Sequence, residues 1–570
     1  GCRKSPASDL YEAKIQQSIN KQSRKSAMPP KKIKRRVVKL DTSNQRSLFE
    51  EALTPVPSTA EKGTAAPVSG IEFIDPDPRD ILLNQVRLDA HLKQTGQSQA
   101  LRVRKLLEGL DWTEFEREYK VGGRRPYAPR AMLGLILYGI MQGISSLRPL
   151  EALARTDLGG MWISGGILPD HSVIGRFIQR HAELLSGEFF EQLTARVLKV
   201  TRSGTQTVAG DGSVIEAAAS RFQLMKAEAL NQAIEKSESS ASTAADAEAE
   251  KQQRRLAELQ QAQTVLHERQ QKRQSKGKPA DKLQINVQEP DAVIQPQKGS
   301  KHFAAAYKPS VLANEIRVIV GQAVDPGSET GMVEGMLQQA QRLGVIETAL
   351  FDAGYFSEGV IEATAARKIE LLCPEGQSQG DDWCKHSEKY YPKSRFRYDL
   401  AQDVYYCPQG HILKPVDCYQ GNERYPGYVR YGTDACGKCA DRDACTKSAK
   451  GRQIKRYAAD EAKDALREKM RQPEVQSRYL KRQGMVEPVF SHLRYRQGLN
   501  RFRRKGLKAV RLEFSLHAMA YNLSRMLALD VFYAGYWRRM SVSAVNNALV
   551  RVISRLTLTP ALYSVAAATA

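Results

Sequence analysis

The sequence predicts an α/β core that follows a helical region and is interrupted by two insertions. Apolar runs alternate with amphipathic segments from residue 303 to residue 374, as strands and helices do in a layered sheet. Residues 80–200 instead carry apolar residues at helical spacing between proline and glycine breaks. Cysteines gather where the alternation stops, within 375–473. We therefore predict a mixed sheet flanked by helices, an all-α N-terminal domain and a Cys-rich insertion.

The order of these parts follows from shifts in composition. At 570 residues the chain should hold several domains, because about 150 residues per domain is usual. Residues 205–224 read as a strand that enters a helix, and 225–285 as an inserted helical hairpin or a partly disordered arm with Leu256, Leu259 and Leu266 on one face. The predicted domains are a basic disordered region at 1–75, a helical domain at 76–203, a catalytic domain at 204–374 and 474–530, the Cys-rich insertion at 375–473 and a tail at 531–570.

The charge balance points to a polyanionic partner. Lysine and arginine number 86 against 63 acids, a net charge of +23. Chains this basic typically bind nucleic acid, because clustered cations release counterions from phosphates. A generally basic housekeeping protein or a membrane-surface binder is the alternative. No apolar run approaches the ~20 residues that span a bilayer, and the polar start predicts no signal peptide, so we expect a cytoplasmic, nucleoid-associated protein.

Three acidic residues stand in distinctive settings. Asp211 ends an apolar run in TVAGDGSVIEAAAS, Asp352 ends another in VIETALFDAGYFS, and Glu487 follows in a late helical segment. Two carboxylates at the ends of neighbouring strands, with a third from a helix, can converge on two Mg²⁺ or Mn²⁺ ions, which prefer carboxylate oxygens. Two such ions activate water and stabilise the leaving oxygen of a phosphodiester. The pattern predicts a two-metal DNA-cutting site.

Glu487 is the only acid among eleven cations between Arg478 and Arg511. A solvated helix face would mix both signs, so the segment predicts cations that remain free for phosphates. We expect Tyr479, Arg482 and Arg494 to contact the strand being cut. The further cations predicted to bind DNA are Arg501, Arg503, Arg504 and Lys505.

The cysteines predict a structural zinc site. Cys436 and Cys439 form a CxxC pair, Cys445 follows, and Cys407 lies in a Cys-Pro-x-Gly turn. Four thiolates on two tight loops match a tetrahedral zinc site, with His411 and Cys418 as competing ligands. Four reduced cysteines without metal, or a redox CxxC, are the alternatives.

The chain resembles bacterial insertion-sequence transposases of the DDE class. The resemblance rests on PRAMLGLILYGIMQGISSLRPLE, PDHSVIGRFIQRH, GDGSVIEAAAS, FDAGYFS, CGKCADRDAC and MVEPVFSHLRYRQGLNRFRRKG. It implies an RNase H-like core, a helical DNA-binding domain, and Asp211, Asp352 and Glu487 as the metal triad. It also places the Tyr-x-x-Arg signature at Tyr479 and Arg482, and Arg494 seven residues after the glutamate. Four residues separate Arg482 from Glu487, where the family signature often has three.

The resemblance implies a transposase that acts as a homodimer on the terminal inverted repeats of its element and on target DNA. A transposase-derived DNA-binding protein without activity, or a metal-dependent endonuclease, is the alternative. A tyrosine recombinase would leave Asp211 and Asp352 unexplained.

Overall fold

The computed structural model describes residues 71–529 apart from 242–245, 276, 278, 298–301, 377–389, 392 and 423–425. Nearly all of the predicted N-terminal region at 1–75 and the predicted tail at 531–570 lie outside the described residues. Within the described part, no helix combines the length and the apolar character that crossing a bilayer requires.

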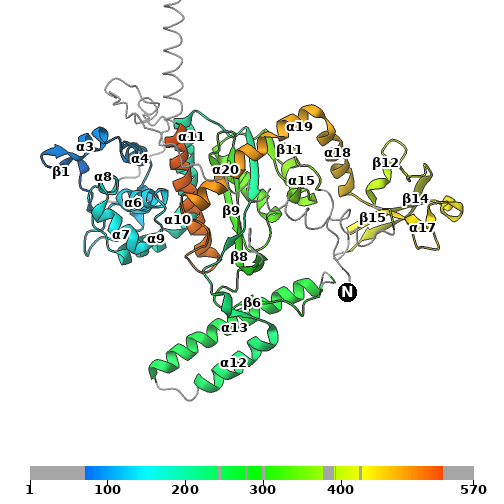
Figure 1. Cartoon of the computed structure of the whole chain (residues 1–570), viewed down its shortest axis with the longest axis horizontal. Helices are drawn as coiled ribbons and strands as arrows, with labels where there is room; N and C mark the ends of the chain where they lie inside the picture. The colour runs from blue at the N-terminus through cyan, green and yellow to red at the C-terminus, as the bar shows by residue number, and fades with distance from the viewer. Residues whose placement is uncertain are drawn as a thin grey trace, which may run out of the picture. The chain divides into compact units, whose positions relative to one another are not determined.

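The main sheet of the described part is mixed and has seven strands (Figure 1). Parallel pairs join β3 to β10 and β10 to β11, while β8 pairs antiparallel with β3 and β9. The first half of β8 also pairs with β4 and β7. The strands are β3 (Thr207–Gly212), β4 (Ile215–Glu216), β7 (Val293–Pro296), β8 (Phe303–Asn314), β9 (Ile319–Asp325), β10 (Thr348–Leu350) and β11 (Glu370–Leu372).

Helices flank this sheet, as the alternating pattern predicts. α14 (Val333–Leu343) packs on β8 and β9, α15 (Glu358–Ala365) on β11, and α20 (Lys481–Tyr495) on β3 and β8. The buried residues of α14 recur at helical spacing, at Val333, Met336, Leu337 and Ala340, which gives the helix one apolar face for the sheet.

The helix predicted after the first strand is wrong. Ile215 and Glu216 form β4, which pairs with Tyr307 and Ala306 of β8. The pairing with β8 overrides the helix preference of the alanines in VIEAAAS, because tertiary contacts outweigh local propensity. Apart from a short 3-10 helix at Arg221–Gln223, helix begins only at α12 (Ala227–Ala241).

The N-terminal region is mostly helical. α6 begins with Pro129 at its first turn, and α9 begins after Asp170, whose carboxylate accepts bonds from the Ser172 and Val173 amides at 2.8 and 2.9 Å. Two short strands, β1 (Leu82–Leu83) and β2 (Val86–Arg87), form a hairpin, so the region is not purely α. Its helices are α3 (Leu88–Gln94), α4 (Gln99–Glu108), α5 (Thr113–Arg117), α6 (Pro129–Met141), α7 (Leu147–Thr156), α8 (Leu158–Ser164), α9 (His171–Arg180), α10 (Ala182–Ser186) and α11 (Glu188–Thr201).

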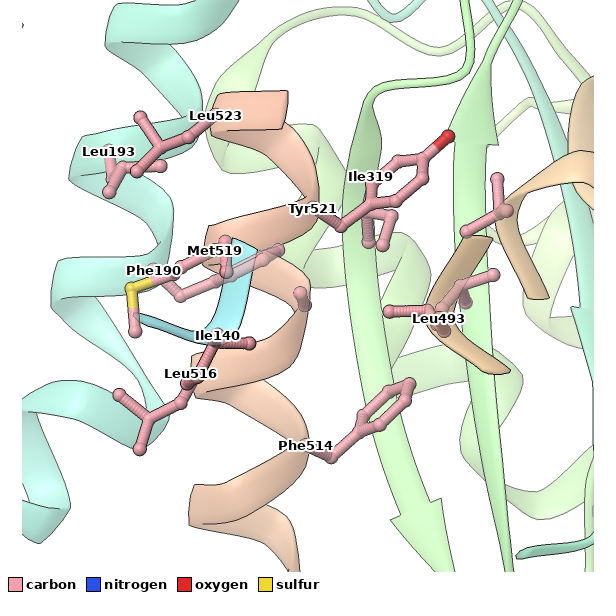
Figure 2. Close-up of a cluster of buried hydrophobic side chains, with 14 of the residues drawn as sticks. Ile140, Phe190, Leu193, Ile319, Leu493, Phe514, Leu516, Met519, Tyr521 and Leu523 are labelled. Atoms are coloured by element: carbon pink, nitrogen blue, oxygen red, sulfur yellow. The ribbon is translucent and has the colours of Figure 1, made fainter. Parts of the chain in front are cut away.

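A helix at residues 507–529 joins the N-terminal helices to the sheet in one hydrophobic core (Figure 2). Buried Asn522 fixes this junction: its amide donates to Thr194 Oγ1 of α11 at 3.1 Å and exchanges two 2.8 Å bonds with the Ile319 backbone of β9. Apolar side chains fill the two sides of the helix: Leu516, Met519 and Leu523 lie on the side of Ile140, Phe190 and Leu193, and Phe514 and Tyr521 lie on the side of the strand that carries Ile319.

The first insertion is a helical hairpin of α12 (Ala227–Ala241) and α13 (Asp246–Gln274). Leu259 and Leu266 are buried against Leu230 and Ile234, and Leu256 packs at the edge of this cluster. The hairpin therefore has its own small core.

The second insertion is a five-stranded antiparallel sheet followed by helices. Phe396, Tyr405, Leu413, Tyr431 and Ile454 form its core. Its elements are β12 (Arg397–Asp399), β13 (Val404–Tyr406), β14 (Ile412–Gly421), β15 (Pro426–Gly432), α17 (Arg442–Cys445), β16 (Ile454–Tyr457), α18 (Ala459–Arg471) and α19 (Pro473–Tyr479).

Candidate active site

Asp211 and Asp352 meet because β3 and β10 are neighbouring parallel strands. Leu350 lies opposite Ala209 in the register, so continuing both strands by two residues brings Asp352 alongside Asp211. Two acids that are 141 positions apart in the sequence therefore share one edge of the sheet.

The glycines on either side of Asp211 leave room for its neighbours. A Cβ on Gly210 would lie 2.1 Å from Cε1 of Phe351, and a Cβ on Gly212 would lie 2.9 Å from the Glu329 side chain. Real Cβ atoms do not approach other atoms this closely, so the Gly-Asp-Gly pattern lets an aromatic ring and a carboxylate close on the strand that carries Asp211.

Asp352 is held by its own loop. Its Oδ1 accepts a bond from the Gly354 amide at 2.9 Å, and Cys373 Sγ donates to its backbone carbonyl at 3.1 Å. Burial raises the pKa of the Cys373 thiol to about 12, and the Asp352 charge adds to this effect. Cys373 is thus a neutral part of the wall beside the site, which its sequence context did not indicate.

Arg482 of α20 bridges the two aspartates. Its Nη2 lies 3.2 Å from Asp211 Oδ1 and 3.5 Å from Asp352 Oδ2, and donates to the Gly210 carbonyl at 3.3 Å. Only 12% of the Arg482 side chain is exposed. The pocket between the two carboxylates therefore accommodates a positive charge.

Burial raises the pKa of Asp211 to about 6, Arg482 opposes the shift, and the charges of Asp352 and Glu329 add to it. Glu329 in turn pairs with Lys308 at 3.2 Å. Neither Glu329 nor Lys308 was predicted. The available signal was the position of Glu329 four residues after the end of β9, at the edge where Asp211 and Asp352 also end their runs.

Glu487 takes no part in the contact that Arg482 makes with Asp211 and Asp352. It is exposed on α20, and its Oε2 accepts a bond from Gln483 at 3.1 Å. Among the described residues, no group of three or more His, Cys, Asp or Glu side chains is arranged to hold a metal ion. Yet α20 runs alongside β3, because Arg482 contacts Gly210 while Arg494 donates to Ser213 Oγ and the Val214 carbonyl, both at 2.7 Å.

Glu487 lies between these two contacts. A helix rises ~1.5 Å per residue, which places Glu487 about 7.5 Å along the axis from Arg482. Five residues also turn the helix by about 500°, so Glu487 lies along the same stretch of β3 but leaves the helix about 140° around its axis from Arg482, on an exposed side.

The expectation that the cations near Glu487 remain free is wrong for several of them. Arg478 pairs with Glu370, and Lys481 lies 3.6 Å from Glu315. These acids come from distant parts of the chain, so the absence of local acids did not predict free cations.

Other arginines predicted to bind DNA bond the protein itself. Arg501 donates to the Ala217 carbonyl at 3.0 Å and to that of Ala219 at 2.5 Å. The Arg503 and Arg504 amides donate to Glu513, and the Arg503 guanidinium bonds Ser146. Lys505 is exposed.

The four predicted zinc ligands are not arranged as a metal-binding group in the described part of the chain, but they line one cavity. Cys407, Cys436, Cys439 and Cys445 all face it together with His411, whereas Cys418 is exposed on β14. Burial raises the pKa of the Cys445 thiol, Arg452 opposes this, and the other three cysteines add to it. The six cysteines in the described part form no disulfide.

The loop at Gly451 and Arg452 closes on Cys436. The Arg452 amide donates to Cys436 Sγ at 3.5 Å. Gly451 has φ of +79°, and a Cβ there would lie 2.8 Å from Cys436 Cβ, so glycine permits this approach.

Comparisons with known families identify two parts of the chain. Residues 406–527 match the family described as "Transposase DDE domain", and residues 88–180 match "Transposase domain (DUF772)". No curated protein matches the chain. The first match includes Glu487 and α20, and a DDE domain implies the RNase H-like core to which the mixed sheet conforms. These two matches confirm the resemblance to insertion-sequence transposases: one part of the chain is similar to a transposase DDE domain and another to a transposase domain.

Proposed function

We propose that this transposase binds the terminal inverted repeats of its element as a homodimer and catalyses metal-dependent DNA cleavage and strand transfer. The observation that carries the proposal is the meeting of Asp211 and Asp352 around the Arg482 guanidinium. A pair of carboxylates that already flanks a cation is suited to divalent ions, which prefer oxygen ligands.

Asp211 and Asp352 would hold Mg²⁺ or Mn²⁺, and Glu487 would complete the set from α20. When bound, two such ions activate water and stabilise the leaving oxygen of a phosphodiester. Arg482, released from the aspartates, and neighbouring Tyr479 would then face the phosphate of the strand being cut. Arg494 would keep its bonds to Ser213 and Val214 and so hold α20 against β3.

Cleavage of element-end DNA by the full chain with Mg²⁺ tests this function. Asp211→Ala, Asp352→Ala and Glu487→Ala should each abolish cleavage and leave DNA binding intact. Glu315→Ala is the matched control, because Glu315 is an exposed acid that also lies beside α20. Cleavage near the wild-type level in one variant removes that residue from the site.

Two other functions remain as outcomes of the same assay. Cleavage without joining to target DNA would identify a metal-dependent endonuclease, and binding without cleavage a DNA-binding protein descended from a transposase. Residues 88–180, which match a transposase domain, are the candidate for recognition of the element end, since base contacts specify a site while phosphate contacts position the protein.

We also propose that the cavity of Cys407, Cys436, Cys439 and Cys445 holds a structural zinc ion. The support is that all four cysteines line one cavity and that a backbone amide donates to Cys436 Sγ. Zinc at such a site stabilises the fold, because four thiolates leave no open position for substrate.

A further inference from the structure

The exposed face of the sheet in the second insertion carries a row of three tyrosines. Tyr419, Tyr428 and Tyr457 lie directly opposite one another on β14, β15 and β16. The ring centroids of Tyr419 and Tyr428 are 5.4 Å apart, and those of Tyr428 and Tyr457 are 5.8 Å apart. Side chains alternate between the faces of a sheet, so the row shares its face with residues two positions away on each strand.

The opposite face accounts for the folding of this sheet. Tyr431 and Ile454 each lie three residues along their strand from a tyrosine of the row, so they point to the opposite face. Each is 2% exposed and belongs to the core of the insertion. The three tyrosines of the row are half-buried instead. The core does not require them, and each presents part of its surface to solvent.

Cations accompany the row on the same face. Lys455 Nζ lies 4.2 Å from the Tyr428 ring centroid, and the Arg430 guanidinium lies 5.9 Å from it. Both cations lower the pKa of the Tyr428 hydroxyl through hydrogen bonds, Arg430 first. Residues 412–457 hold ten lysines and arginines against five acids, which gives this sheet a positive charge that complements phosphates.

We propose that the Tyr419–Tyr428–Tyr457 row binds single-stranded DNA, with unpaired bases stacked on the rings and phosphates beside Lys455 and Arg430. Aromatic side chains on a sheet with adjacent cations bind single strands in this way, because every base has a face that can stack. A duplex keeps its base faces stacked inside, so the row discriminates against paired DNA. The inference goes beyond the proposed chemistry, since it needs none of the three acids.

Fluorescence anisotropy of the full chain with labelled oligothymidylate tests the proposal, and a hairpin duplex of equal length is the comparison. Tyr428→Ala should weaken binding of the single strand by about tenfold to a hundredfold and change duplex binding much less. Tyr428→Phe keeps the ring and should keep the affinity. Circular dichroism and the melting temperature establish that each variant folds.

Tyr406→Ala is the matched control. Tyr406 also has an arginine, Arg397, over its ring at 4.9 Å, but it lies opposite Ile412, seven residues from Tyr419 along β14 and thus about 23 Å away at 3.3 Å per residue. The Tyr406→Ala variant should therefore bind the single strand with unchanged affinity.

Several results would overturn the proposal. They are an unchanged single-strand affinity in folded Tyr428→Ala, an equal loss for the duplex, and an equal loss in Tyr406→Ala. Tighter binding of oligouridylate than of oligothymidylate would assign the row to RNA. If Tyr428→Ala changes the sedimentation coefficient of the protein and leaves the single-strand affinity unchanged, the tyrosine row is a contact between copies of the chain.

Discussion

Replacing Asp211 by asparagine should stabilise the metal-free protein at neutral pH while abolishing the proposed cleavage. Burial raises the pKa of Asp211 from 3.8 to about 6. An acid whose pKa is raised by folding favours the protonated native state, so its stabilising effect is complete below about pH 4 and is lost as the pH rises through about 6. Ionised Asp211 therefore costs stability.

The magnitude follows from the size of this shift. A pKa shift of about two units lowers the free energy of unfolding by about 3 kcal/mol at pH 8 and by about 1.6 kcal/mol at pH 5, because one pKa unit corresponds to about 1.36 kcal/mol. These are upper limits, because 22% of the side chain is exposed. Asparagine has no charge to desolvate and still accepts a bond from Arg482, so the advantage of Asp211→Asn should grow by about 1.4 kcal/mol between pH 5 and pH 8.

Thermal unfolding with a chelator present, at a series of pH values, measures this difference. The melting temperature of Asp211→Asn should exceed that of the wild type by a margin that widens with pH. A margin that shrinks or reverses would refute the reasoning. Asp403→Asn is a control of opposite sign, because hydrogen bonds from Tyr398 and Tyr431 lower the pKa of Asp403, so its loss should destabilise the protein at neutral pH.

Three further outcomes are expected. Metal analysis should find one zinc per chain, and Cys436→Ser should lose it and lower the melting temperature without direct loss of chemistry; folded zinc-free protein would contradict this. Gly210→Ala should lower stability by several kcal/mol, since its Cβ would lie 2.1 Å from the Phe351 ring, and a smaller residue at 351 should restore part of it. Lys505→Ala should reduce the salt dependence of DNA binding by about one unit of slope without altering melting, whereas Arg501→Ala should lower the melting temperature, as its bonds to backbone carbonyls require.

The positions of Asp211 and Asp352 could be predicted because their signal is local. Each follows an apolar run and precedes a glycine within two residues, so each marks the end of a buried strand whatever the rest of the chain does. The parallel pairing of β3 and β10 then brings them together. Glu487 lacks such a signal, because a helix position sets neither the rotation nor the depth of its side chain.

The partners of the arginines could not be predicted from local sequence. Arg494 bonds Val214, and Arg501 bonds Ala217, across 280 and 284 residues. The cationic side chains of a segment with few acids can be predicted to remain free for phosphates only if carbonyls and carboxylates from distant parts of the chain are ignored. Only the folded sheet shows that β3 and β4 present carbonyls to this segment.

Arg482 connects the stability of this site with its proposed chemistry. A chain that buries Asp211 beside Asp352 must supply a positive charge, or the repulsion and desolvation of the two carboxylates go uncompensated. In the metal-free protein that charge comes from α20, the helix that also carries Glu487. Under the proposed function, divalent cations held by the aspartates would compete with Arg482 for the same carboxylates. The same residue would then serve two states: it pairs with the acids in the metal-free protein, and its guanidinium would face the DNA strand in the metal-bound protein.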